Sequence, residues 1–340
     1  MSLKSLVYHL RRKPILAASQ VAVETTSEVR NTKSEKKQGT LSFYLHFFLR
    51  DKPAFVGLAM IAIFFVWAFI EGVAQFLSGV LKQPSYAWAL LPSNPFILDF
   101  PHALLAPSLA QFPNLIFGTN NNGQSILAEL LYAAPHDAIA PIVVVGSAVL
   151  IGMFLGTAAG YYGGWVDEIM MRATDAFLSL PFLIFAITVS VLFGAGFISL
   201  LEALMLIWWP TYARFFRVQA LTIRQRGYIE SAKLNGVNPV VILIKHVIPN
   251  SIDPVIAYMT LDLGTVILIF ASLAFLGIGI SFISGSPYPE WGYVSSIGLG
   301  YFPSDWWWSL IPGIVIALVV VAFTLAGDRL QDLISGRMTY

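Results

Sequence analysis

Long apolar runs are the feature that most constrains how this chain folds. Six runs have roughly the length that a helix needs to cross about 30 Å of hydrocarbon. Of the 340 residues, 57% are hydrophobic and 11% are charged, whereas a soluble domain carries about 25% charge. We therefore predict an all-α integral membrane protein with six transmembrane helices. The predicted spans are 54–77, 138–159, 176–193, 197–213, 252–283 and 306–326.

Lysine and arginine residues orient these spans. Nineteen of the 20 lie before the first span, in or beside the second-to-third and fourth-to-fifth loops, or near the C-terminus, and Lys82 alone is left for the opposite side. Loops rich in basic residues stay in the cytoplasm. We therefore predict a multi-pass protein of the cell (plasma or inner) membrane with both termini cytoplasmic.

The segments between the spans differ in composition. Residues 20–40 are polar and poor in aromatics, which predicts disorder, and residues 41–52 resemble an interfacial helix. Both belong to a cytoplasmic N-terminal segment, 1–53. Residues 78–137 form an extracytoplasmic loop rich in proline and aromatics, and residues 329–340 form a cytoplasmic tail.

Several kinds of chemistry are not indicated by the sequence. The chain has no cysteine, and its five histidines lack metal-ligand spacing, so we predict no metal site and no disulfide. No Ser-His-Asp or Cys-His arrangement is evident, which leaves no catalytic residue to name. No GxxxxGK[ST] phosphate-binding loop occurs, so ATP-driven work would need a separate ATPase subunit.

The loop at 224–250 carries the most specific pattern. Gly227 and Gly236 bracket a short helix that has Glu230 near its start, where the helix dipole favours an anion. Gly236 suits a helix end and Pro239 the first turn of a second helix. Pro249 is expected to redirect the chain into the membrane. From the residues alone, this is either an ordinary amphipathic surface loop or a helix that docks a cytosolic partner and transmits its motion.

A family resemblance bears on that choice. Glu230, Ser231 and Ala232, followed by Gly236 and by Ile248-Pro249, resemble the EAA loop of binding-protein-dependent ABC importer permeases. Over about residues 44–333 the chain is similar to the dipeptide, oligopeptide and nickel group of these permeases, and specifically to the second permease of the pair. The matching segments are FFLRDKPAFVGLAMI, GYYGGWVDEIMMRATDAFLSLP, WWPTYARFFRVQAL, LAFLGIGI, SPYPEWG and PGIVIALVVVAFTLAGDRLQD.

The resemblance implies a fold and a set of partners. It implies the type I ABC importer permease fold, with an ABC transmembrane type-1 domain over 138–328 and a cytoplasmic coupling helix that docks on the ATPase. The docking residues would be Glu230, Ser231, Ala232 and Gly236, with Pro239 and Pro249 shaping the turns. The implied partners are a second homologous permease, two ABC ATPases that hold ATP and Mg, an extracytoplasmic solute-binding protein and lipid, with no nucleic acid.

The implied function is transport without enzymatic activity of the chain's own. The chain would form half of the translocation pore and would itself bind no cofactor. Asn120, Asn121 and Asn122 stand where the family usually has charged residues, so the solute stays open between an oligopeptide and an oligosaccharide. The alternatives are an intramembrane enzyme and a stand-alone secondary carrier; the first needs convergent polar residues and the second inverted repeats, and neither pattern is evident.

Several other polar and small residues allow two structural or functional interpretations. Asp262 in the fifth span is either a contact between helices or a lining residue of the pore. Glu290 and Trp291, in the outer loop, are read as a contact for an external partner, and the tryptophans there also fit an interfacial aromatic belt. Glu71 and Glu202 are expected to be solvated at the membrane interface. A stripe of glycines at 152, 156 and 160 predicts close helix packing, with a hinge as the alternative.

Overall fold

The computed structural model describes residues 51–109, 115–194, 196–283 and 286–334. The chain divides into two compact units, 1–55 and 56–340, and the second is the subject below. The prediction of disorder at 20–40 and that of an interfacial helix at 41–52, apart from its last two residues, lie outside the described residues.

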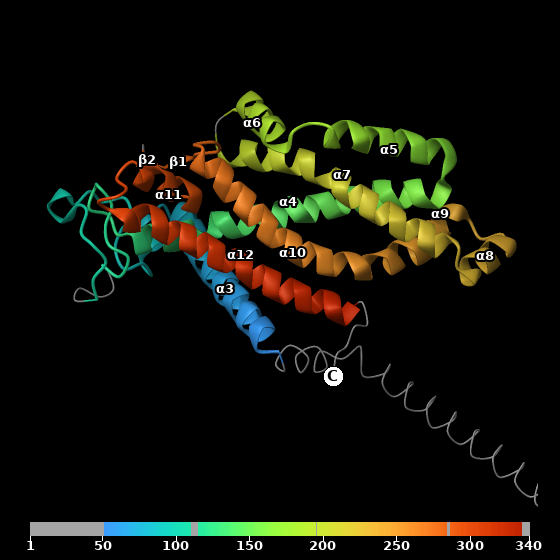
Figure 1. Ribbon diagram of the computed structural model, residues 1–340, viewed down its shortest axis with the longest axis horizontal. Helices are drawn as coiled ribbons and strands as arrows, with labels where there is room; N and C mark the ends of the chain where they lie inside the picture. Colours follow the sequence, from blue (N-terminus) through green and yellow to red (C-terminus); the bar gives the residue numbers. More distant parts are fainter. Residues whose placement is uncertain (1–50, 110–114, 195, 284–285, 335–340) are drawn as a thin grey trace, which may run out of the picture. The chain divides into compact units, whose positions relative to one another are not determined.

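The described chain is built mainly of helices, with one short antiparallel hairpin that pairs Phe282 with Pro287 (Figure 1). In chain order the elements are α3 (Lys52–Leu81), η1 (Pro84–Trp88), η2 (Phe100–His102), α4 (Ile126–Tyr162), α5 (Gly164–Leu178), α6 (Phe182–Phe193), α7 (Phe197–Arg224), α8 (Gly227–Leu234), α9 (Pro239–Ile242), the π-helical η3 (Leu243–Val247), α10 (Ile248–Phe275), β1 (Phe282–Ile283), β2 (Ser286–Pro287), α11 (Trp291–Leu299) and α12 (Trp306–Ile334).

Length and apolarity single out the helices that suit a bilayer. In the described part of the chain these are α3, α4, the run Pro239–Phe275 through α9, η3 and α10, and α12. The pair α5 and α6 makes a fifth span if it is counted as one. The expected multi-pass helical class is therefore confirmed. These criteria give four or five spans where the sequence predicted six, and α7, with 28 residues, is the long helix outside that count.

The predicted third span, 176–193, is not one continuous helix. α5 ends at Leu178, α6 starts at Phe182, and the two helices are bent by 89°. Pro181 explains the break, because proline has no N–H to donate to the preceding turn and disfavours helical geometry at the residue before it. Apolarity continues through this point, so hydropathy alone could not reveal the bend.

Two other predicted span boundaries are also wrong. α4 starts at Ile126, not at 138, because the Ser125 side chain caps it by accepting a hydrogen bond from the Ala128 amide at 3.4 Å. The expected start lay just after Asp137, a charged residue that the structure buries inside the fold. α10 ends at Phe275, not at 283, because Gly277 turns the chain at a φ of +81°.

Pro135 lies inside α4 and has no N–H to donate to the Leu131 carbonyl four residues before it. Side chains from distant segments donate to that carbonyl and to the carbonyls on either side of it, and such donors let a helix that spans lipid tolerate proline. The donors are Trp67 Nε1 to Leu131 O at 3.0 Å, Gln75 Nε2 to Tyr132 O at 2.8 Å, Tyr288 Oη to Tyr132 O at 2.9 Å, and Trp291 Nε1 to Leu130 O at 2.9 Å.

The glycine stripe of α4 lies directly against α7. A Cβ on Gly156 would come 2.1 Å from the Ala213 carbonyl oxygen, and one on Gly160 would come 2.5 Å from the Arg217 carbonyl oxygen. A Cβ on Gly152 would come 2.5 Å from the Tyr212 Cβ. Small residues let two helix backbones approach this closely. The contacts therefore support close helix packing as the role of these glycines.

Substitution of one stripe glycine tests this packing. Gly156→Ala places a methyl carbon well inside the van der Waals contact distance of the Ala213 oxygen, so we expect a loss of about 1–3 kcal/mol of stability. Gly146→Ala is the matched control, because a Cβ there meets nothing within 4 Å and alanine favours helix. The midpoint of thermal unfolding in detergent should drop for Gly156→Ala alone; equal midpoints would contradict the close contact.

Candidate functional site

The α8 helix lies at one end of the long helices and is held there by a single buried side chain (Figure 1). Ile229 is fully buried in a cluster with Tyr161 of α4 and Ile223 of α7. Ala232, on the same side, packs against this cluster. The Lys233 ammonium lies 5.4 Å from the centre of the Tyr161 ring, within the range of a cation–π contact. The short helix is therefore anchored to both α4 and α7.

The end of α8 is a Schellman motif that requires its glycine. The Gly236 amide donates to Lys233 O at 3.0 Å, and the Val237 amide donates to Ala232 O at 3.1 Å, which is the bond pattern of that motif. Gly236 has a φ of +72°, a left-handed conformation that glycine adopts without the Cβ penalty. The glycine therefore terminates the helix and sends the chain toward α9.

The two prolines of this loop occupy helix starts. Pro239 is in the first turn of α9, after Asn238, whose side chain accepts from the Val240 amide at 2.9 Å. Pro249 is in the first turn of α10, and the helical run continues from Pro239 to Phe275. The expectation that Pro249 redirects the chain is therefore wrong, because proline is compatible with a helix's first turn.

The side of α8 away from the anchor is open to solvent. Glu230, Ser231 and Gly236 are exposed, and Ala232 is half-buried. Leu234 is 89% exposed. Exposed apolar side chains continue beyond it along the loop at Val237, Val240, Val241 and Ile244. We call this set, with Glu230, Ser231 and Leu234, the loop surface; its apolar content is typical of a protein interaction site.

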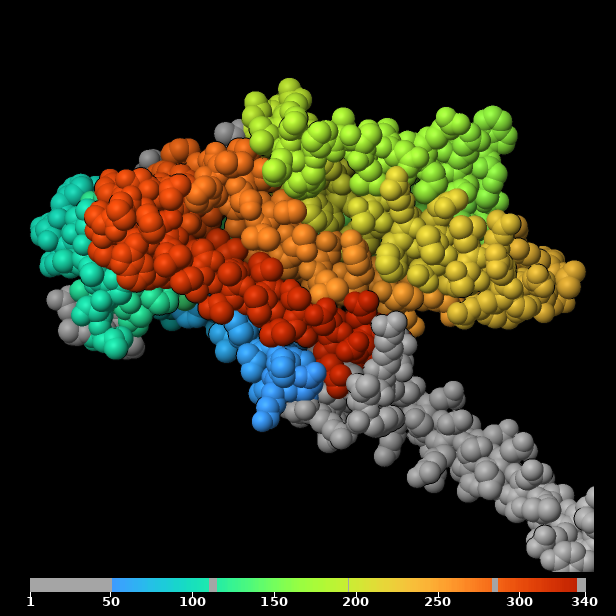
Figure 2. All heavy atoms as spheres, in the orientation of Figure 1, coloured from blue at the N-terminus to red at the C-terminus, as the bar shows by residue number. Residues whose placement is uncertain are grey.

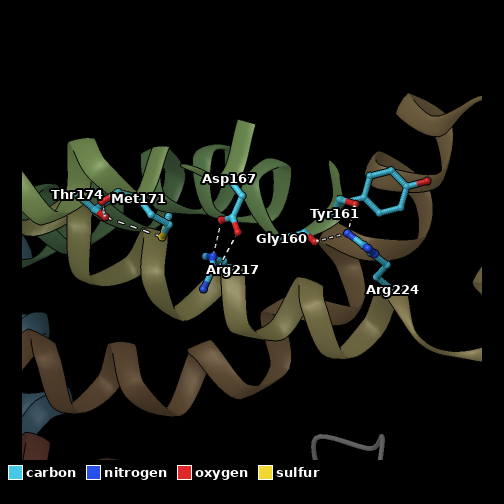
Figure 3. A network of polar contacts seen from close by, with 7 residues as sticks. All are labelled: Gly160, Tyr161, Asp167, Met171, Thr174, Arg217 and Arg224. Atoms are coloured by element: carbon cyan, nitrogen blue, oxygen red, sulfur yellow. Dashed lines mark hydrogen bonds and ion pairs between the residues drawn. The ribbon is translucent and has the colours of Figure 1, made fainter. Parts of the chain in front are cut away.

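Polar contacts hold together the helices from which this loop projects (Figure 3). Arg224, the last residue of α7, donates to Tyr161 O at 3.1 Å and to Gly160 O at 3.5 Å, at the C-terminal end of α4, where a cation is favoured. Arg217 forms a two-pronged ion pair with Asp167 of α5 at 2.5 and 2.6 Å. The ends of α4, α5 and α7 are thus tied together, so the loop surface projects from a firmly connected base.

Asp262 lies buried between α10 and α7. Its Oδ2 accepts hydrogen bonds from Trp208 Nε1 at 2.7 Å and from Tyr212 Oη at 2.8 Å. The structure therefore shows a contact between helices, which is one of the two roles that the sequence predicted for Asp262. The role in lining a pore stays a prediction. Trp208 and Tyr212 were not identified from the sequence, where aromatic residues in an apolar run give no sign of such a partner.

Glu290 and Trp291 were expected to contact an external partner, but they do not form an exposed surface. Glu290 is fully buried and Trp291 is 3% exposed, and the indole donates to α4 at Leu130. Glu71, expected to be solvated, is likewise buried and accepts from Gln75 Nε2 at 3.2 Å. Glu290 lies between β2 and α11, so its position in an outer loop was not a position in water. Glu202 is exposed, as expected.

Burial changes the chemistry of Glu290. Desolvation, with the neighbouring Asp137 carboxylate adding to it, raises the pKa of Glu290 from 4.5 to about 9. The folded chain thus keeps this proton up to about pH 9, whereas the unfolded chain releases it near pH 4.5. The stability of the fold should fall as pH rises between these two values.

The Glu290→Gln variant tests this titration. Glutamine has nearly the same shape and no proton to release, so the variant should gain stability over the original chain at pH 8 and much less at pH 5. Thermal unfolding in detergent at both pH values measures the difference. Glu202→Gln is the control for an exposed carboxylate, and its effect on the unfolding midpoint should be the same at both pH values. A stabilisation by Glu290→Gln that did not depend on pH would refute the assignment.

Known proteins match most of the chain. The sequence profile of a family described as "Binding-protein-dependent transport system inner membrane component" matches residues 148–340. The chain is 32% identical over 311 residues to the probable D,D-dipeptide transport system permease protein of Escherichia coli strain K12, covering 92% of this chain and 96% of the relative.

Other relatives carry similar names. The chain is 32% identical over 289 residues to a dipeptide transport system permease protein of Alkalihalophilus pseudofirmus, covering 85% of this chain and 87% of the relative. It is 33% identical over 221 residues to a glutathione transport system permease protein of Pectobacterium atrosepticum, covering 65% of this chain and 72% of the relative.

Proposed function

Because the chain belongs to the family of binding-protein-dependent transport system inner membrane components, in its dipeptide and oligopeptide group, we propose that it drives solute import by docking an ATPase on α8. It is a multi-pass membrane permease, and the finer proposal concerns how it couples to ATP. The observation that carries this proposal is the loop surface: an exposed helix with Leu234 at its tip, set on an anchor shared by α4 and α7.

The geometry of α8 suits a docking element. Docking buries Leu234, and full burial of a leucine side chain contributes roughly 1.5–3 kcal/mol. Glu230 and Ser231 supply exposed polar groups beside Leu234. Polar contacts to them would set the position of α8 in the partner's cleft, and the leucine would add affinity. Gly236 ends the helix within one turn of this tip. The element is therefore compact enough to enter a cleft.

The partners and the energy source follow from this arrangement. Two ABC ATPases hold ATP and Mg, because the sequence contains no phosphate-binding loop of its own. A second homologous permease completes the pore, and an extracytoplasmic binding protein delivers the solute. Closure of the ATPases on ATP displaces α8 and opens the pore outward, and hydrolysis resets it inward.

The proposed topology has six crossings with both termini cytoplasmic. α5 and α6 together form the third crossing, and α7 forms the fourth, with its arginine-rich half toward the cytoplasm. The basic residues of the α7–α10 loop support this orientation. The fold is that of type I importers, and α8 is its coupling helix.

The solute is proposed to be a short peptide. Relatives that are named for dipeptide and glutathione transport support a peptide. Asn120, Asn121 and Asn122 line an outer cavity of about 230 Å³ together with Phe96 and Trp308. Amide and aromatic groups also suit a neutral oligosaccharide, which is the alternative solute.

Leu234 provides the test of docking. Leu234→Asp places a charge where an apolar contact is needed, so we expect uptake to fall at least about tenfold, the effect of 1.4 kcal/mol. Leu234→Met is the matched control, since it keeps an apolar side chain of similar volume and should keep uptake. Uptake is measured in proteoliposomes that contain the complete transporter, alongside co-purification of the ATPase.

The outcomes separate docking from folding. Leu234 contacts solvent, so neither variant should change membrane insertion or the unfolding midpoint. Lost uptake together with lost ATPase co-purification supports the proposal. Uptake by Leu234→Asp within about twofold of the original chain would rule out α8 as the docking element.

A further inference from the structure

Helices α5 and α7 expose charged side chains on one shared face. Arg172 and Glu168 pair at 2.6 Å with 77% and 51% of their side chains exposed. Arg214 of α7 pairs with Asp175 of α5, with 50% and 62% exposed. Thr211 and Val218 lie on the same side of α7 as Arg214, three and four residues away, and are exposed too. We call these six residues the polar face; Figure 2 shows α5, in green, at the surface beside α7.

The polar face lies beside a part of α4 whose exposed side chains are apolar. Gly156 of α4 is packed against Ala213, so Arg214 is level with a point five residues, or about 8 Å, before Tyr161 at the end of α4. The exposed side chains on α4 near that depth are apolar, with Leu150 57% and Phe154 59% exposed. Those side chains suit lipid, whereas exposed ion pairs in lipid are strongly unfavourable.

The broken helix next to this face gives independent support. Residues 179–181, between α5 and α6, are non-helical and all exposed. The ring of Phe177 lies 5.3 Å from that of Trp209, and the ring of Phe182 lies 5.3 Å from that of Trp208. The break is thus level with the two tryptophans, about another 8 Å beyond Arg214. Irregular backbone at such depth occurs where it is buried in protein or lines a water-filled cavity.

From these contacts we infer that the polar face and the break at 179–181 line a water-filled passage, which is the inner part of the solute's path. This inference rests on the proposed transport function and names the surface along which the solute leaves. The two ion pairs are exposed, and hydrated ion pairs need no further partner, whereas burial in a dry interface would carry a large desolvation penalty. Aspartate is too short to reach the interface by extending its side chain, so Asp175 must meet water where it stands.

The absence of cysteine from the sequence allows a direct test. Single cysteines are introduced by Thr211→Cys and Val218→Cys on the polar face, and by Phe154→Cys on the apolar side of α4 as the control. The complete transporter in lipid nanodiscs is treated with a small cationic methanethiosulfonate. The thiolate, which forms only where water reaches the thiol, attacks the reagent's sulfenyl sulfur; a mixed disulfide forms and methanesulfinate leaves. We expect both polar-face cysteines to react roughly tenfold or more faster than the control.

A second measurement separates the passage from an open cytoplasmic surface. Trapping the ATPases with ADP and vanadate should close the inner end of the passage and slow the reaction at position 211. Reaction at 211 as slow as at 154 would overturn the inference, because the face would then lie in lipid or in a dry contact. Fast reaction that trapping leaves unchanged would overturn it too, because the face would belong to the cytoplasmic surface.

The proposed function is checked separately in the same samples. Solute uptake is measured for the original chain and for Thr211→Cys before any reagent is added. If the original complex takes up no solute, the proposed function fails, while the rates at 211, 218 and 154 still decide whether water reaches the polar face. If uptake is normal and the rates at 211 and 154 are equal, the inference alone fails.

Discussion

The close approach of α4 and α7 is the contact on which the rest of the described structure depends. Gly156 and Gly160 let the two backbones meet without intervening side chains. At that distance Arg224 reaches the last carbonyls of α4, and Arg217 reaches Asp167 on α5. The anchor of α8 is built in the same place, since the cluster around Ile229 draws on both helices. In lipid, where the hydrophobic effect between helices is weak, such packing and polar contact are what hold helices together.

A second constraint is the complete pairing of backbone groups in a low-dielectric environment. Pro135 removes one bond from the hydrogen-bond ladder of α4, and the carbonyls of this turn accept from α3, from Tyr288 and from the start of α11. Three distant segments thus meet at this turn. Trp291 faces inward here, with its indole N–H donating to Leu130 O. The outer loops are thus parts of the helical core.

The sequence predicted what depends on composition and local chemistry. Apolar runs located α3 and α12, and the Gly-to-Gly spacing of the loop placed a short helix where α8 lies, from Gly227 to Leu234. It did not predict the bend at Pro181, because hydropathy is continuous across it. Nor did it predict the burial of Glu290 or the partners of Asp262, because these depend on residues 50 or more positions away. Long-range polar contacts leave no local pattern to read.

The positions of regular and irregular helix suggest how motion at α8 reaches the polar face. Ile229 packs α8 against α4 and α7, so under the proposed docking a force on Leu234 would act on these two helices together. Arg214 and Thr211 belong to α7 and move with it, whereas α6 is separated from α5 by the exposed break at 179–181. On the other side of the loop, the π-helical turn η3 at Leu243–Val247 interrupts the run into α10, and such turns often mark hinges. A displacement of the α4–α7 pair would therefore be absorbed at these two interruptions. One of them borders the polar face, so the same motion that α8 receives would change the width of the proposed passage there.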